Sequence, residues 1–157
     1  MERVMIISLG CPKNTVDSEI MSAVAENAGY EITTVAEKAD IAVVNTCAFI
    51  EPAVDEAITT ILETAELKKS GSLKKLIVAG CLTERYREKI IDEIPEVDLC
   101  IGVDGIPMIG ELLMQNKTGT VTGQLESVDF LNLTRKLSAG GGTAYVKISD
   151  GCDNTCT

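Results

Sequence analysis

Short apolar runs alternate along the chain with longer segments of helical periodicity, and this alternation restricts the fold more than any other feature. Residues 41–44 and 76–79 are apolar throughout, as expected of strands covered by helices on both faces of a parallel sheet. Between these runs, a stripe of apolar residues recurs at helical spacing behind Pro52, which fits the first helical position. The stripe consists of Val54, Ile58, Ile61, Leu62 and Ala65.

The remaining elements continue the same alternation. Further strands are expected at residues 4–9, 30–34 and 97–101. Further helices are expected from Asn14 or Thr15 to the residue before Gly29, from Thr83 to Ile94, and over residues 107–115. The order predicts an α/β fold with a doubly wound, mostly parallel open sheet of the flavodoxin or Rossmann type.

The composition changes after Lys117, and this change predicts the domain organisation. Residues 1–116 form the expected α/β domain, and residues 117–143, rich in Gly, Thr, Ser and Asn, read as a linker. Residues 144–157 then begin a second domain, with a predicted strand at 144–148 followed by a Cys-x3-Cys of Cys152 and Cys156. We expect the chain to be a fragment of a longer protein.

Charge and residue content exclude several classes of protein. The formal net charge is −10, so direct nucleic-acid binding, which rests on a basic surface, is not expected. Neither a leader peptide nor an apolar run long enough to span a membrane is visible, and a cytoplasmic location without membrane contact is predicted. Six cysteines in the cytoplasm indicate metal ligands or redox thiols, and the absence of histidine removes the usual nitrogen ligand of zinc.

Three of the cysteines directly follow predicted strands. Cys11, Cys47 and Cys81 come after the runs at 4–9, 41–44 and 76–79, and the carboxyl ends of parallel strands share one edge of a sheet. Three thiolates without histidine favour an iron–sulfur cluster with one iron open to another ligand. Two alternatives remain: core packing of all three, and a redox dithiol, although the close Cys-x-x-Cys spacing is missing.

Residues beside these cysteines fit the same interpretation. Gly10 and Gly80 lack a Cβ, so backbone can come close to a cluster, and helices that begin after the cysteines would direct their positive ends at it. Asn14, Asn45 and Thr46 are candidates to donate hydrogen bonds to sulfur, with capping of their own helices or turns as the alternative. Cys100 lies inside a predicted strand and is expected to pack in the core.

The motifs resemble a known family. Gly10-Cys11 with Asn14, then Asn45-Thr46-Cys47, then Gly80-Cys81, are similar to the amino-terminal domain of the radical S-adenosylmethionine (SAM) methylthiotransferases. The tail from Lys147 to Cys156 resembles the entry to the radical-SAM barrel of that family, whose third cysteine would fall at position 159, past the end of this chain.

The resemblance implies cofactors and roles for these residues. Cys11, Cys47 and Cys81 would hold an auxiliary [4Fe–4S] cluster that delivers sulfur, and Cys152 and Cys156 would hold the radical-SAM [4Fe–4S] cluster with the third ligand. The longer protein would use SAM and an external electron donor, and would be a methylthiotransferase. The 157-residue chain would be inactive alone, because the radical site is incomplete.

The stretch Ser8-Leu9-Gly10-Cys11-Pro12-Lys13-Asn14 resembles the branch that methylthiolates the β-carbon of an aspartate in a small-subunit ribosomal protein. The alternative within the family is a methylthiotransferase acting on tRNA adenosine. Outside the family, a flavodoxin-like binding module or a thiol redox module remains, although the loop after the first strand has no Gly-rich phosphate cradle.

Overall fold

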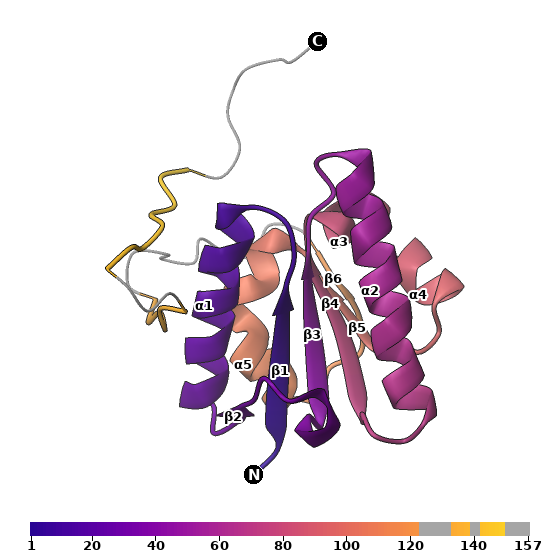
Figure 1. The fold of residues 1–157 in the computed structure, drawn as a ribbon. Helices are drawn as coiled ribbons and strands as arrows, with labels where there is room; N and C mark the ends of the chain where they lie inside the picture. The colour runs from indigo at the N-terminus through magenta and orange to yellow at the C-terminus, as the bar shows by residue number, and fades with distance from the viewer. Residues whose placement is uncertain (123–132, 139–141, 150–157) are drawn as a thin grey trace.

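The computed structural model describes residues 1–122, 133–138 and 142–149. Its centre is a sheet of six parallel strands in the order β2-β1-β3-β4-β5-β6 (Figure 1). The strands are β1 (Arg3–Ser8), β2 (Glu31–Ile32), β3 (Ile41–Thr46), β4 (Lys75–Gly80), β5 (Leu99–Ile101) and β6 (Gly119–Val121). The predicted doubly wound, parallel open sheet is confirmed.

Helices cover both faces of this sheet (Figure 1). The α-helices are α1 (Pro12–Asn27), α2 (Glu51–Lys69), α3 (Cys81–Tyr86), α4 (Lys89–Glu93) and α5 (Ile109–Met114), with 3-10 helices at η1 (Ala36–Lys38) and η2 (Val103–Met108). Alternate residues of β3 enter two separate cores: Ile41 and Val43 pack with α1 and α5, whereas Ala42 and Val44 pack with α2, α3 and α4. A fully apolar strand is therefore required, because neither face meets water.

The α2 stripe differs from the prediction at two positions. Val54, Ile61 and Ala65 are buried as expected, but Ile58 and Leu62 are 40% and 48% exposed. Ala57 and Thr64 complete the buried face instead. The reason is packing: α2 contacts the sheet along one stripe, and the two residues at the margin of this stripe stay partly at the surface.

The helix predicted from Thr83 to Ile94 is two short helices. Arg87 has a φ of 46°, so it interrupts the backbone between α3 and α4. The first long helix begins at Pro12 with Cys11 as its N-cap, not at Asn14 or Thr15, and α2 begins one residue before Pro52. The segment expected as a helix at 107–115 begins as η2, with Pro107 inside it, and continues as α5.

Strand predictions after residue 116 also differ. β6 lies within the segment expected as a linker and pairs with β5, so the sheet continues past residue 116. Residues 144–148 carry no strand, because a strand is formed by pairing and no neighbouring strand pairs with this stretch among the described residues. In the described ranges, no helix has both the length and the apolar content that crossing a membrane requires.

Candidate metal centre

Three cysteines meet at the carboxyl edge of the sheet. Cys11 caps α1 just after β1, Cys47 follows the last residue of β3, and Cys81 begins α3 directly after β4. β1, β3 and β4 are neighbours in the sheet, and their ends are level, with Ser8 opposite Asn45 and Thr46 opposite Gly80. The predicted convergence on one edge is therefore confirmed for the backbone positions.

The three thiols differ in their exposure. Cys11 and Cys81 are exposed and Cys47 is buried, and all three are free cysteines. Cys47 is thus the buried member of the three, whereas Cys11 at the N-cap of α1 and Cys81 at the start of α3 are exposed residues. An edge with two exposed cysteines and one buried cysteine can accept a group that arrives from solvent.

The glycines beside the cysteines fit tightly against protein atoms. A Cβ built on Gly10 would lie 2.4 Å from Cβ of Cys47, and Gly10 has a φ of 90°. A Cβ on Gly80 would lie 2.6 Å from the Thr46 carbonyl oxygen and 2.7 Å from Oδ1 of Asn45. Both glycines leave room for the neighbouring strand end, so the loop that carries Cys11 and the junction of β4 and α3 that carries Cys81 lie against the end of β3.

Asn14 and Asn45 form an interlocked pair beneath these loops. Nδ2 of Asn14 donates to the Thr46 carbonyl at 2.9 Å and to Oδ1 of Asn45 at 3.3 Å. Nδ2 of Asn45 donates back to the Asn14 carbonyl at 2.9 Å and to Oγ of Ser18 at 3.0 Å. Carbonyl oxygens only accept, so the orientation of both amides is determined by these contacts.

This network also reaches the thiol of Cys11. Its Sγ donates to Oδ1 of Asn14 at 3.2 Å, so Asn14 accepts a hydrogen bond from sulfur and does not donate one. Asn14 does not cap α1 either, since Cys11 is the N-cap. The hydroxyl of Thr46 donates to the Ala79 carbonyl at 2.6 Å and so ties β3 to β4. The three polar residues singled out from the sequence are all buried and contact the protein itself.

Electrostatics at this edge are dominated by burial and negative charge. Burial first, then the charges of Cys47, Cys11 and Asp17, raise the pKa of the Cys81 thiol, while Lys13 lowers it. Cys11, Cys47 and Asp17 therefore lie close enough to Cys81 for their charges to act on its thiol. Cys100 is different: it is fully buried in β5, and burial raises the pKa of its thiol to about 12. Its predicted place in the core is confirmed.

Within the described residues, no three or more Cys, Asp or Glu side chains close around a point that would hold a single metal ion. A site for one ion requires all ligands within bonding distance of that ion. A cluster places each thiolate on a different iron and is satisfied by a wider triangle. Cys152 and Cys156 lie outside the described residues.

Comparison with known proteins identifies the family. Residues 3–102 match the family described as uncharacterized protein family UPF0004. The chain belongs to this family. The match runs from β1 to the end of β5 and includes Cys11, Cys47 and Cys81.

Curated relatives of this chain carry the name ribosomal protein uS12 methylthiotransferase RimO. The relative from Lachnoclostridium phytofermentans is 48% identical over 99% of this chain, and the one from Solibacter usitatus is 49% identical over 99%. The relative from Clostridioides difficile is 43% identical over the full chain. This chain spans 33–36% of the length of these relatives. The resemblance to methylthiotransferases that the cysteine motifs predict is confirmed.

Sequence reasoning missed several residues at the edge. Ser18 accepts from Asn45, and Asp17 lies within electrostatic range of Cys81. Phe49, two residues after Cys47, is 90% exposed and lines a hollow with Cys81 and Arg85. Phe49 could have been singled out from the sequence, because only 3% of the residues are aromatic. No sequence feature singles out Asp17 and Ser18, because one turn of a helix does not reveal which strand it contacts.

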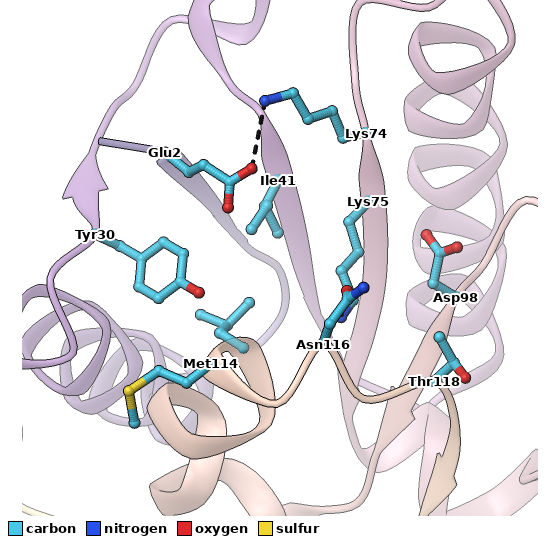
Figure 2. Close-up of a pocket in the computed structure, with 10 residues that line it drawn as sticks. Glu2, Tyr30, Ile41, Lys74, Lys75, Asp98, Met114, Asn116 and Thr118 are labelled. Carbon is cyan, nitrogen blue, oxygen red and sulfur yellow. Dashed lines mark hydrogen bonds and ion pairs between the residues drawn. The ribbon is translucent and has the colours of Figure 1, made fainter.

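The opposite edge of the sheet holds a separate cavity of about 460 Å³ (Figure 2). Lys75, the first residue of β4, is buried there and donates to Oδ1 of Asn116 at 3.1 Å. Burial lowers the pKa of its ammonium group, while Asp98 and Glu2 raise it. None of the three cysteines lines this cavity, which is therefore distinct from the centre described above.

Proposed function

We propose that Cys11, Cys47 and Cys81 hold a [4Fe–4S] cluster in this domain, and that the domain is the amino-terminal part of a methylthiotransferase. The observation that carries the proposal is the arrival of three cysteines at one sheet edge from three adjacent parallel strands. The match to the family and the names of the curated relatives support it.

The residues present fit such a cluster. The donor set is three thiols, histidine is missing from the whole chain, and thiolates are the ligands that iron–sulfur clusters take. Cys11 and Cys81 are exposed residues, so this edge of the sheet can be reached from solvent. When bound, the cluster would supply an iron open to an exogenous sulfur ligand, and hence the sulfur chemistry that the thiols alone lack.

Other residues of the chain would position the three cysteines at the carboxyl edge of the sheet. α1 begins next to Cys11 and directs unpaired backbone N–H groups toward a bound anionic group. The Asn14–Asn45 pair holds the Cys11 loop on the end of β3, and the tight contact of Gly10 with Cys47 sets how close those two ligands lie. Burial of Cys47 keeps water from one side of the centre.

For the longer protein we propose the activity that its relatives' name states, methylthiolation of ribosomal protein uS12. Cys152, Cys156 and a third cysteine would hold the radical-SAM cluster, and SAM and an external electron donor would be required. The tRNA-adenosine alternative has less support, because the names of these relatives state a ribosomal protein as the substrate.

Anaerobic reconstitution with iron and sulfide tests the ligand set. The chain should carry Cys152→Ala and Cys156→Ala, so that iron counts report on the sheet edge alone. We expect about four irons per chain, together with the absorbance of a [4Fe–4S] cluster. Cys47→Ala should remove this iron, and Cys100→Ala, in the same sheet but away from the edge, should retain it.

Two outcomes would contradict the proposal. One is the absence of iron uptake by a folded chain that retains all three edge cysteines. The other is equal uptake in the Cys47→Ala and Cys100→Ala chains. The substrate is tested separately, with a protein that has the full length of the relatives. In the presence of SAM and a reductant, this protein should add a methylthio group to uS12, and the 157-residue chain should not. Mass spectrometry of uS12 measures the added group.

A further inference from the structure

A segment beyond the sheet lies against α1. Residues 133–138 and 142–149, which we call the strap, follow the side of α1 in Figure 1. Lys136 pairs with Glu26, Arg135 pairs with Glu19, and Lys147 pairs with Asp17 at 2.9 Å. All three cations come from the strap and all three carboxylates come from α1.

Glu19 is the central anchor. It is 4% exposed, although a glutamate is rarely buried without partners. Among the described residues, the hydrogen-bond partners of its carboxylate come from the strap: Nε of Arg135, and the backbone N–H and hydroxyl of Ser138 at 2.7 Å and 2.6 Å. Its backbone carbonyl also accepts from the N–H of Lys136 at 3.2 Å. Burial is the largest single influence and raises the pKa of the Glu19 carboxyl, but the contacts with Ser138 and Arg135 together outweigh it, so the pKa is lowered.

Arg135 joins the two stretches of the strap. One guanidinium nitrogen binds Glu19, and another donates to the carbonyl of Tyr145 at 2.6 Å. A single side chain thus connects α1, residues 133–138 and residues 142–149. Lysine could not replace it, because an ammonium group does not present two separated donors in a fixed plane.

The two stretches of the strap contact α1 at different levels: residues 133–138 meet Glu19 and Glu26, and residues 142–149 meet Asp17. Glu26 lies near the carboxyl end of α1, Glu19 lies in its middle, and Asp17 lies near the amino end, which starts beside Cys11. Lys147 therefore reaches the end of α1 that belongs to the cysteine edge.

We propose that the face of α1 that carries Glu19 and Glu26, together with Asp17 nearer the amino end of the helix, is a docking surface for the strap, and that Arg135 is the positioning residue that directs the chain along α1 toward the cysteine edge. The surface is not a general solvated helix face, since Asp17 and Glu19 are both buried by what covers them. The inference goes beyond the proposed function and does not depend on a metal.

Limited trypsin digestion of the metal-free 157-residue chain tests the docking. Trypsin cuts after Arg135, Lys136 and Lys147, and a docked strap hides these bonds. We expect Glu19→Ala to speed cleavage after Arg135 by roughly tenfold or more, because hydrogen bonds to a buried charge are lost. Glu26→Ala is the matched control: its ion pair is exposed, so the rate should change by less than about threefold.

A second variant and a second measurement distinguish loss of docking from unfolding of the domain. Asp17→Asn should speed cleavage after Lys147 more than cleavage after Arg135. Circular dichroism and slow hydrogen exchange of the β3 amides should show that the sheet of each variant is intact, and exchange at the Ser138 amide should rise in Glu19→Ala. Wild-type cleavage after Arg135 at the same rate as in Glu19→Ala, with an intact sheet, would overturn the proposal. Its failure leaves iron uptake unaffected, so the two proposals are separable.

Discussion

At the scale of single residues, Gly10 determines how closely the loop that carries Cys11 approaches Cys47. Its φ of 90° lies in the left-handed region, and the Cys47 side chain occupies the space that a Cβ would need. Gly29 has nearly the same φ, 92°, with no atom within 4 Å of its Cβ position. A side chain at Gly10 would meet both backbone strain and a steric conflict, whereas a side chain at Gly29 would meet backbone strain alone.

Gly10→Ala should lower the free energy of unfolding by about 2–4 kcal/mol, because left-handed strain and overpacking against Cys47 both apply. Gly29→Ala should cost only the strain, about 1–2 kcal/mol. Urea denaturation followed by circular dichroism measures both. Equal losses in the two variants would show that the contact between Gly10 and Cys47 is not tight.

Cys100 makes the free energy of unfolding sensitive to alkaline pH. Burial raises the pKa of its thiol to about 12, so the folded chain keeps the proton at a pH where the unfolded chain has lost it. Stability from this group is complete below the unfolded pKa near 9 and is lost as the pH rises toward 12.

Between these limits the free energy of unfolding should fall more steeply in the wild type than in Cys100→Ala, by about 1.4 kcal/mol per pH unit. Urea titrations at several pH values above 9 provide the two slopes. Because both chains contain the other cysteines, the difference isolates Cys100. Parallel curves would mean that its thiol ionises freely in the folded state.

At the scale of elements, the amide pair of Asn14 and Asn45 holds the first turn of α1 on the end of β3. Both side chains are buried, and each donates a hydrogen bond to a backbone carbonyl of the other segment. Removal of either amide leaves buried acceptors unsatisfied. The link between helix and strand therefore depends on two side chains rather than on apolar contact alone.

Asn45→Ala should lower the free energy of unfolding by roughly 1–3 kcal/mol for these reasons. Gln115→Ala removes an exposed hydrogen bond to Glu111 and should change it by less than about 0.5 kcal/mol. The alkylation rate of Cys11 in the metal-free chain provides a second measurement, since the loop should become more accessible in Asn45→Ala. Similar effects from the two substitutions would argue against a special role for the pair.

At the scale of the whole molecule, the sheet does not end with the predicted α/β domain at residue 116. β6 pairs with β5, and the N–H of Gly102 donates to the Val121 carbonyl at 2.8 Å while the N–H of Gly119 donates to the Asp98 carbonyl at 2.8 Å. Loss of β6 would expose the edge of β5, whose residues are all buried. Unpaired strand edges favour self-association.

A chain that ends at residue 116 should therefore be less stable than one that ends at residue 122, by about 2 kcal/mol, and should self-associate. Urea denaturation and size-exclusion chromatography at several concentrations measure the two effects. Equal stability and elution would show that the sheet is complete without β6, and the predicted boundary would then hold.

What the sequence determined by itself was local or periodic. Apolar runs such as 41–44 and 76–79 specify strands because burial on both faces permits only apolar residues, and cysteines placed after three such runs must share an edge once the strands are parallel. Cys100 could be assigned to the core in the same way. The motif around Cys11, Cys47 and Cys81 also indicated the family correctly.

Only the tertiary structure decided which atoms meet across elements. The break at Arg87, the exposure of Ile58 and Leu62, and the pairing of β6 depend on neighbours far away in the chain. The same holds for Glu19, which reads as one acidic residue on a helix surface until Arg135 and Ser138, more than a hundred residues later, cover it. Periodicity describes a helix or strand on its own, whereas burial and hydrogen bonding are properties of the surfaces that come together.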